Sequence, residues 1–263
     1  MTPLQPHREP RVPPLPLPPG FASPSLAAAD AEGPAFELKF LLDEARAQEV
    51  EVWARVRLAL DPHGDPALGG AYLTTSLYFD TPGLDVYHRS PGYKRRKFRL
   101  RRYGAAPWAF LERKSKWGDR VRKRRTPLPD EELALLAHPM SVVTWPGHWF
   151  HRRLVARRLG PACRVSYQRT AYVGACAAGP LRLTLDRRVR GASASDWGLA
   201  PPEGALPLLR GQAILELKFH SALPGPFREL VEGMRLSPSG VSKYRRGREA
   251  WGLSAPGREA ADA

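Results

Sequence analysis

The chain has 263 residues, with 41 Lys and Arg against 26 Asp and Glu, which gives a formal net charge of +15. Its 43% hydrophobic residues are enough to bury a core, which excludes disorder over the whole chain. No stretch approaches the ~18 consecutive apolar residues of a membrane-spanning helix, and two cysteines are too few for a disulfide framework. These features favour a reduced, cytoplasmic protein that attracts anions.

The two ends of the chain differ in composition from its middle. Residues 1–34 contain ten prolines, which lack a backbone N–H donor and favour coil or polyproline structure. We therefore predict a disordered tail over 1–34 and, from the small and polar residues 253–263, a second disordered tail. Residues 35–252 remain as a single folded domain.

In chain order, the folded part consists mainly of predicted β-strands. Residue types alternate with period two in eight segments: 36–42, 73–80, 97–104, 108–115, 119–128, 163–173, 181–189 and 213–220. Many antiparallel strands with a few peripheral helices predict an α+β, mainly β fold, built as a closed antiparallel β-barrel.

Helical periodicity is confined to four segments: 45–60, a stretch capped by Asp130, 150–159 and 227–234. In the first of these, Asp43 can cap the helix, and Val52, Val56 and Ala59 lie on one apolar stripe. We expect that stripe to face the sheet.

The predicted strands repeat a pattern of charge. Residues i and i+2 of a strand share a face, so charged residues gather on one face of each strand and apolar residues on the other. These same-face pairs are Glu37 with Lys39, Arg99 with Arg101, Glu112 with Lys114, Arg182 with Asp186, and Glu216 with Lys218.

The pattern allows two arrangements of the barrel. If the charges face outward, the barrel has an apolar core. If they face inward, they line a tunnel that water or a polyanion must fill. Periodicity alone favours the outward arrangement.

Two features favour the tunnel instead. The charged faces mix cations, which bind phosphate oxygens, with carboxylates, which hold Mg²⁺ or Mn²⁺. Many of the cations are Arg, the residue suited to bidentate contact with phosphate. In the basic run 120–125, we expect Lys123 and Arg125 to face inward and Arg120, Arg122 and Arg124 to face outward.

The order of these segments resembles the VTC (vacuolar transporter chaperone) domain, a branch of the triphosphate tunnel metalloenzymes in the CYTH-like superfamily. The matching pieces span about 35–248 and read FELKF, TTSLYFDT, KFRLRRYG, FLERKSKWGDRVRKRR, SYQRTAY, LRLTLD, ILELKF and VSKYRRG. The resemblance implies a tunnel-shaped barrel that binds a triphosphate lengthwise. In polymerase members it implies transfer of the γ-phosphate of ATP onto a growing polyphosphate chain, with Mn²⁺ or Mg²⁺.

The resemblance also implies roles for individual residues. The substrate-binding positions would be Lys39, Arg99, Arg101, Lys114, Lys123, Arg169, Arg182, Lys218 and Lys243. Catalysis would depend on Arg99, Arg101, Lys114, Arg169, Arg182 and Glu216. Glu216 would hold the metal, with Glu37 or Glu112 as helpers. Asp186 is interpreted as structural, because it is expected to end its strand at a turn.

Two departures from the family pattern bear on activity. Tunnel triphosphatases and cyclase-like members open with E-x-E-x-K, but Ala35 stands where the first Glu would be. This weakens the hydrolase and cyclase interpretations and favours the VTC branch. The chain also lacks the lipid-binding and membrane segments of eukaryotic polymerase subunits, so export of polymer would require a membrane partner protein.

The sequence therefore predicts a metal-dependent phosphotransferase of the polyphosphate polymerase type, with ATP or triphosphate and polyphosphate as its partners. A tripolyphosphatase or nucleoside triphosphatase, in which water is the acceptor, remains an alternative. So does a binding module for polyphosphate or inositol phosphate without turnover. A nucleic-acid binder is disfavoured, because carboxylates alternate with the cations at strand spacing and no recognition helix is evident.

Overall fold

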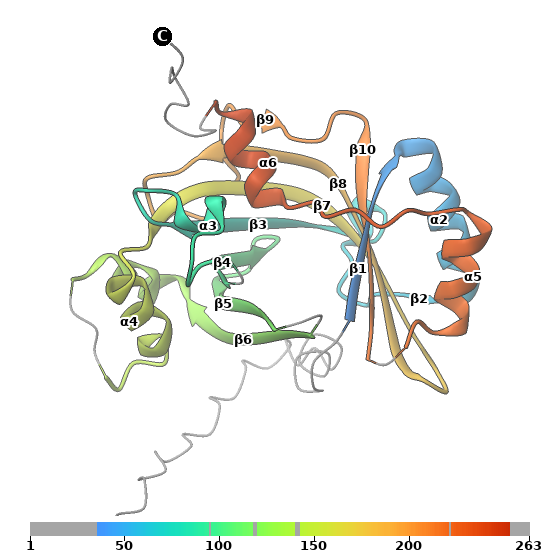
Figure 1. The fold of residues 1–263 in the computed structure, drawn as a ribbon, viewed down its shortest axis with the longest axis horizontal. Coiled ribbons are helices and arrows are strands. Elements are labelled where there is room, and N and C mark those ends of the chain that lie inside the picture. Colours follow the sequence, from blue (N-terminus) through green and yellow to red (C-terminus); the bar gives the residue numbers. More distant parts are fainter. Residues whose placement is uncertain (1–35, 95, 118–119, 140–142, 221, 253–263) are drawn as a thin grey trace, which may run out of the picture.

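The computed structural model describes residues 36–94, 96–117, 120–139, 143–220 and 222–252. The predicted tails, 1–34 and 253–263, lie outside the described residues. Between them, one antiparallel sheet organises the chain (Figure 1). The fold is mainly β, with a few short helices around the sheet, as the strand pattern predicts.

The sheet has ten strands, and eight of them follow the order β1-β10-β8-β7-β3-β4-β5-β6. The two others are short: β2 pairs with β7, and β9 pairs with β8. The strands are β1 Phe36–Asp43, β2 Ala59–Leu60, β3 Ala71–Asp80, β4 Arg96–Tyr103, β5 Trp108–Trp117, β6 Arg120–Pro129, β7 Gly160–Cys176, β8 Gly179–Ser193, β9 Leu206–Pro207 and β10 Gln212–Phe219. All eight predicted strands are present, and β7 and β8 extend well beyond their predicted ends.

The prediction of a closed barrel is wrong, because the sheet does not close. Strands β1 and β6 stand at the two ends of the order, and no described main-chain ladder joins them. The sheet nevertheless curls until Cα atoms of β1 and β6 come within 8 Å, which gives a tunnel-like fold with an open seam. Alternation determines which residues share a face, but closure also needs the last two strands to meet in hydrogen-bonding register.

The helices lie around the sheet. They are α2 Glu44–Arg57, α3 Asp85–His88, α4 His148–Ala156, α5 Gly225–Gly233 and α6 Lys243–Ala250, with the 3₁₀ helices η1 Pro66–Leu68 and η2 Asp130–Ala137. Figure 1 shows α2 and α5 together at one end of the molecule, beside β1 and β10, and α4 at the opposite end. Asp43 caps α2 as predicted, and its Oδ1 accepts from the backbone N–H of Arg46 (2.8 Å). Asp130 does not cap η2, which begins at Asp130 itself after Pro129.

Helix α2 buries a different face from the predicted one. Ala47, Val50 and Ala54 are fully buried, whereas Val52 is 64% exposed and Val56 is 76% exposed. Ala59 lies beyond the helix, in β2. Packing against the sheet favours the buried stripe over the predicted one, because the small side chains of Ala47 and Ala54 let the helix approach the sheet closely.

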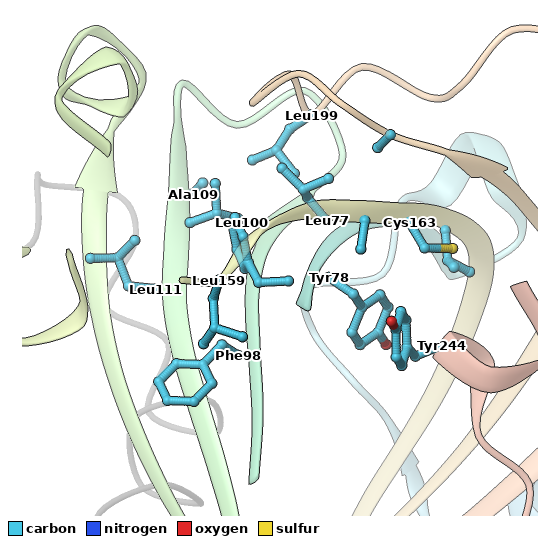
Figure 2. Packing of buried hydrophobic residues seen from close by; sticks show 14 of the residues in the cluster. Leu77, Tyr78, Phe98, Leu100, Ala109, Leu111, Leu159, Cys163, Leu199 and Tyr244 are labelled. Atoms are coloured by element: carbon cyan, nitrogen blue, oxygen red, sulfur yellow. The ribbon is translucent and has the colours of Figure 1, made fainter. Parts of the chain in front are cut away.

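Two apolar clusters pack the helices against the curled sheet, and most of their residues lie on its outer face. One packs α2 and α5 against β1, β8 and β10, with Phe40, Leu183, Leu215 and Phe227 all fully buried. The other packs α4 against β3, β4, β5 and β6 and continues to α6. Figure 2 shows part of this cluster, including Leu77 of β3, Leu100 of β4 and Tyr244 of α6. Where α6 joins the second cluster, the ring of Tyr244 lies 5.5 Å from that of Tyr78 in β3, which shares its face of the sheet with Arg99. These clusters leave the opposite face of the strands for the charged residues.

Candidate functional site

The charged residues of the strands face the inside of the curl. Lys114 of β5 bonds Glu37 of β1 (Nζ to Oε2 2.6 Å), although five strands separate β5 from β1 in the sheet order. Side chains of such distant strands can meet only across the interior. The face that carries them, here called the charged face, is therefore the inner one. The alternative arrangement, with the charges in solvent and the apolar residues inside, is excluded.

A first group of charges joins β1, β10 and β5. Lys39 Nζ lies 2.8 Å from Glu37 Oε1 and 3.0 Å from Glu216 Oε2, and Lys218 Nζ lies 2.8 Å from Glu216 Oε1. The strand register places Lys39 opposite Glu216 and Glu37 opposite Lys218. Burial and Glu216 both raise the pKa of Glu37, but the surrounding lysines outweigh them and lower it to about 2. Glu37 is therefore ionised at neutral pH.

A second group surrounds Glu112 in β5, whose carboxylate is 1% exposed. Four cations from β4 and β6 approach it: Arg99 at 2.5 Å, Arg101 at 3.9 Å, Lys123 at 3.3 Å and Arg125 at 3.2 Å. Burial opposes ionisation of Glu112, yet these cations lower its pKa well below the ordinary value. The prediction that Lys123 and Arg125 face inward is confirmed.

The same prediction placed Arg120, Arg122 and Arg124 on the outer face, and it is confirmed for Arg124. The guanidinium of Arg124 lies 4.2 Å from the ring of Trp149 in α4, on the outer face. The side chains of Arg120 and Arg122 lie outside the described residues.

A third group corrects the interpretation of Asp186. This residue lies within β8 and not at its end, opposite Arg169 of β7, and its side chain is fully buried on the charged face. Arg169 donates to it through Nε (2.6 Å) and Nη2 (2.8 Å), and Lys243 Nζ lies 2.5 Å from Oδ2. Lys243 is the first residue of α6, which Ser242 caps. Strand β8 continues to Ser193, so no turn follows Asp186.

A fourth contact fixes Arg182 and was missed by sequence reasoning. Its Nη2 donates to Asp61 Oδ2 (2.7 Å) and to the hydroxyl of Tyr72 (3.3 Å). Its Nη1 is buried and makes no hydrogen bond to any described residue, so it is free to serve as a donor. Asp61 is 1% exposed and follows β2. It stands 121 residues from Arg182 in the chain, and no local pattern links the two.

Aromatic and hydroxyl side chains lie between the cations. Ser76 Oγ accepts from Arg101 Nε (3.1 Å), and the Tyr103 hydroxyl accepts from Arg125 Nη2 (3.0 Å). Burial raises the pKa of Tyr103, but Arg125 and Arg101 outweigh that effect and lower it to about 7. Strand alternation places Arg101 on the same face as Tyr103, but nothing in the sequence near Tyr103 shows that Arg125 of β6 reaches its hydroxyl.

The charged face carries more positive than negative charge. The cations described above are Lys39, Arg99, Arg101, Lys114, Lys123, Arg125, Arg169, Arg182, Lys218 and Lys243. Their carboxylate partners are Glu37, Asp61, Glu112, Asp186 and Glu216. Each carboxylate holds the cations around it in place, and the excess of cations suits a polyanion. All the sequence-predicted site residues lie on this face.

Two of the three predicted metal-binding carboxylates lie together. Glu37 and Glu216 both bond Lys39 Nζ, whereas Glu112 bonds the separate set of cations on β4 and β6. The described residues contain no group of three His, Cys, Asp or Glu side chains placed to hold a metal. Mg²⁺ is commonly bound by one or two carboxylates together with substrate phosphates. The pair Glu37 and Glu216 fits that mode, with phosphate oxygens completing the coordination.

The sequence profile of the VTC domain family matches residues 35–251. The chain belongs to the VTC domain family. This match covers every strand of the sheet and every residue of the charged face. A search of curated protein sequences found no match.

Solved structures of several other proteins are similar to this chain. A Bacillus halodurans protein named as a candidate adenylate cyclase is 14% identical to this VTC domain chain, with a TM-score of 0.50. The aligned region covers 80% of this chain and 96% of the Bacillus halodurans chain. The Hippeastrum protein HpAC1, named as a candidate adenylyl cyclase with a dominant triphosphatase activity, is 17% identical, with a TM-score of 0.46 and coverages of 82% and 96%. The PH1819 protein of Pyrococcus horikoshii is 13% identical, with a TM-score of 0.44 and coverages of 82% and 99%.

Among the helices that the structure describes, none is both long enough and apolar enough to cross a membrane.

Proposed function

We propose that this VTC domain binds a triphosphate or polyphosphate chain along its charged face and extends the polymer with the γ-phosphate of ATP. The observation that supports this best is the set of cations on seven different strands, β1, β4, β5, β6, β7, β8 and β10, that converge on one interior from all sides. A linear polyanion can contact all of them at once, because its charge repeats along its length.

The arginines would bind and orient the phosphates. Arg99 and Arg101 from β4 meet Arg169 from β7 and Arg182 from β8 on the same face, each held by a buried carboxylate or hydroxyl. Pre-oriented guanidinium groups stabilise the charge that builds up on phosphate oxygens in the transition state. The fixed partners reduce the reorganisation needed when the substrate binds.

Transfer itself needs little covalent help from the protein. A terminal oxygen of the acceptor polyphosphate attacks the γ-phosphorus of ATP, and the bond from that phosphorus to the β–γ bridging oxygen breaks. ADP leaves with the electron pair. The attacking oxygen is already deprotonated at neutral pH, so no general base is required. Lys39, Lys218 and Lys243 would hold the phosphates on either side of the reacting pair.

A divalent metal would bind at Glu37 and Glu216 and supply further positive charge to the phosphate oxygens. The two carboxylates are ionised and already hold cationic lysine groups. Lys39 and Lys218, which pair with these carboxylates in the free protein, would then pair with phosphate oxygens instead.

The direct test incubates the purified chain with ATP and Mn²⁺ and follows polyphosphate on gels together with free phosphate. We expect long polymer from the wild type and a loss of at least about 100-fold in Glu216→Ala and Arg99→Ala, in line with removal of one transition-state contact. Arg228→Ala, an exposed arginine on α5, is the matched control and should retain wild-type activity.

Each alternative product would assign a different function. Free phosphate without polymer would identify a nucleoside triphosphatase or tripolyphosphatase on the same residues, with water as the acceptor. Tight binding of triphosphate with neither product would identify a binding module. In both cases the polymerase proposal would be wrong, while the assignment of the charged face as the phosphate site would stand.

A further inference from the structure

A second concentration of positive charge lies outside the charged face. Five arginines on the outer side of the sheet come from β4, β6 and the region of α4, and we call them the arginine patch: Arg96, Arg124, Arg152, Arg153 and Arg157. Burial lowers the pKa of Arg153, and so do Arg152, Arg157 and Arg96. Burial likewise lowers the pKa of Arg124, with Arg153 and Arg152 adding to it. The five guanidinium groups are therefore close enough to repel one another.

Aromatic rings hold part of this patch in place. The guanidinium of Arg124 lies 4.2 Å from the centroid of the Trp149 ring, and that of Arg153 lies 5.9 Å from it. The guanidinium of Arg157 lies 5.2 Å from the ring of Tyr93, whose hydroxyl donates to the Arg157 carbonyl (3.3 Å). Contact with a ring occupies the flat face of a guanidinium, while its N–H donors lie in the plane and can still bind an anion.

The patch has no acidic counterpart among the described residues. None of its five arginines forms an ion pair with a described carboxylate, whereas the arginines of the charged face all do. Grouped like charges without partners destabilise the folded chain. A surface of this kind is typical of a site that binds a polyanion.

The position of the patch connects it with the charged face. Arg96 is followed in β4 by Lys97, and Arg124 is preceded in β6 by Lys123. Lys114 of β5, the strand between them, stands opposite both of these lysines. Because neighbouring residues of a strand point to opposite faces, the patch and these three lysines lie back to back at the same ends of β4, β5 and β6. A chain that passes around this edge of the sheet would meet the patch next.

We propose that the arginine patch binds a stretch of polyphosphate outside the charged face, so that a long chain is held at two places. This inference rests on the proposed function, which supplies the polyphosphate. Guanidinium groups match phosphate oxygens in geometry and charge, and a phosphate chain presents these oxygens at every repeat. Phospholipid headgroups share the phosphate chemistry, but the continuity with the charged face favours the polymer.

The test compares two triple variants that remove the same charge. Arg124→Gln, Arg152→Gln and Arg157→Gln are combined in the patch variant. Exposed arginines elsewhere, Arg57, Arg210 and Arg228, are changed to Gln in the control variant. In Figure 1, α2 and α5, which carry Arg57 and Arg228, lie at the far end of the molecule from α4. Affinity for long-chain polyphosphate and for triphosphate is measured at several salt concentrations.

We expect the patch variant to bind long-chain polyphosphate about tenfold more weakly, with a shallower dependence of affinity on salt, because fewer counterions are released. Its affinity for triphosphate, which is too short to leave the charged face, should not change. The control variant should bind both as the wild type does.

Several results would overturn the inference. An equal loss in the control variant, or an equal loss for triphosphate, would mean that the patch acts only through net charge or through the charged face. Weaker binding to anionic phospholipid vesicles with unchanged binding of polyphosphate would assign the patch to lipid. By contrast, a wild type that binds long polyphosphate through the patch but neither binds triphosphate nor forms product would refute the proposed function and leave standing only the assignment of the patch as a polyphosphate site.

Discussion

At the scale of single residues, the charged face is built from buried ions that depend on one another. Glu112 and Asp186 are almost fully buried and are stable as carboxylates only because cations from neighbouring strands surround them. The same cations act on neutral groups. Tyr103 lies beside Arg125 and near Arg101, and these two lower its pKa from 10 to about 7 against the effect of burial.

Tyr103 should therefore report on ligand binding. In the free protein, its phenol should ionise as the pH rises through about 7, and ultraviolet absorbance of the phenolate measures this step. Triphosphate places negative charge near Arg101 and Arg125, so it should raise the pKa of Tyr103 and suppress the phenolate signal at pH 8.

Two matched variants identify the source of that signal. Tyr103→Phe should abolish the step. Tyr72→Phe should leave it intact, because burial raises the pKa of Tyr72 to about 12. A titration step near neutral pH that persists in Tyr103→Phe would contradict the assignment, as would a step that triphosphate does not move.

At the scale of elements, the position of a helix depends on the face that it buries and on the residue that caps its N-terminus. Helix α6 shows the functional consequence, because Ser242 caps it at the point where Lys243 enters the charged face and bonds Asp186. Helix α2 shows the role of packing. Its buried side contacts β1, β8 and β10 through residues that include Val50, while Val52 on the other side faces solvent.

The two valines of α2 should therefore respond differently to the same substitution. Val50→Ala should lower the free energy of unfolding by about 2 kcal/mol, because it leaves a cavity between α2 and the sheet. Val52→Ala should change it by less than about 0.5 kcal/mol. Urea unfolding followed by circular dichroism measures both, and similar losses for the two variants would contradict the observed orientation of the helix.

At the scale of the whole molecule, the open seam between β1 and β6 makes the interior adaptable. No described main-chain ladder joins these strands, and the ion pair of Lys114 with Glu37 provides a link across the interior. A phosphate chain bound to cations on both sides of the seam would strengthen that link. Ligand binding should therefore tighten the two edge strands more than the central ones.

Hydrogen exchange tests this expectation. Backbone amides of β1 and β6 should exchange faster than those of β3 and β7, and triphosphate should slow the edge strands by about tenfold. Lys114→Gln should speed exchange in β1 in the free protein, because it breaks the ion pair with Glu37. Lys94→Gln, an exposed lysine in the loop before β4, is the control and should leave β1 unchanged. Equal protection of edge and central strands would contradict an open seam.

Much of the candidate site could be predicted from local pattern. Alternation places Glu37 with Lys39, Arg99 with Arg101 and Glu216 with Lys218 on shared faces, because successive side chains of a strand point to opposite sides. All eight main strands follow from the same rule. Which of the two faces is inside does not follow from it, because an amphipathic strand looks the same in either orientation.

The remaining features depend on residues that are distant in the chain. The pairing of Arg182 with Asp61 joins residues 121 positions apart, and the contact of Lys243 with Asp186 joins residues 57 positions apart. The orientation of α2 and the failure of the sheet to close depend likewise on what each element meets in space. The sequence by itself determined the strands and the residues that share each face, since these depend on backbone geometry alone. The tertiary structure decided which face encloses the charges and which carboxylate holds each cation, since these depend on long-range pairing.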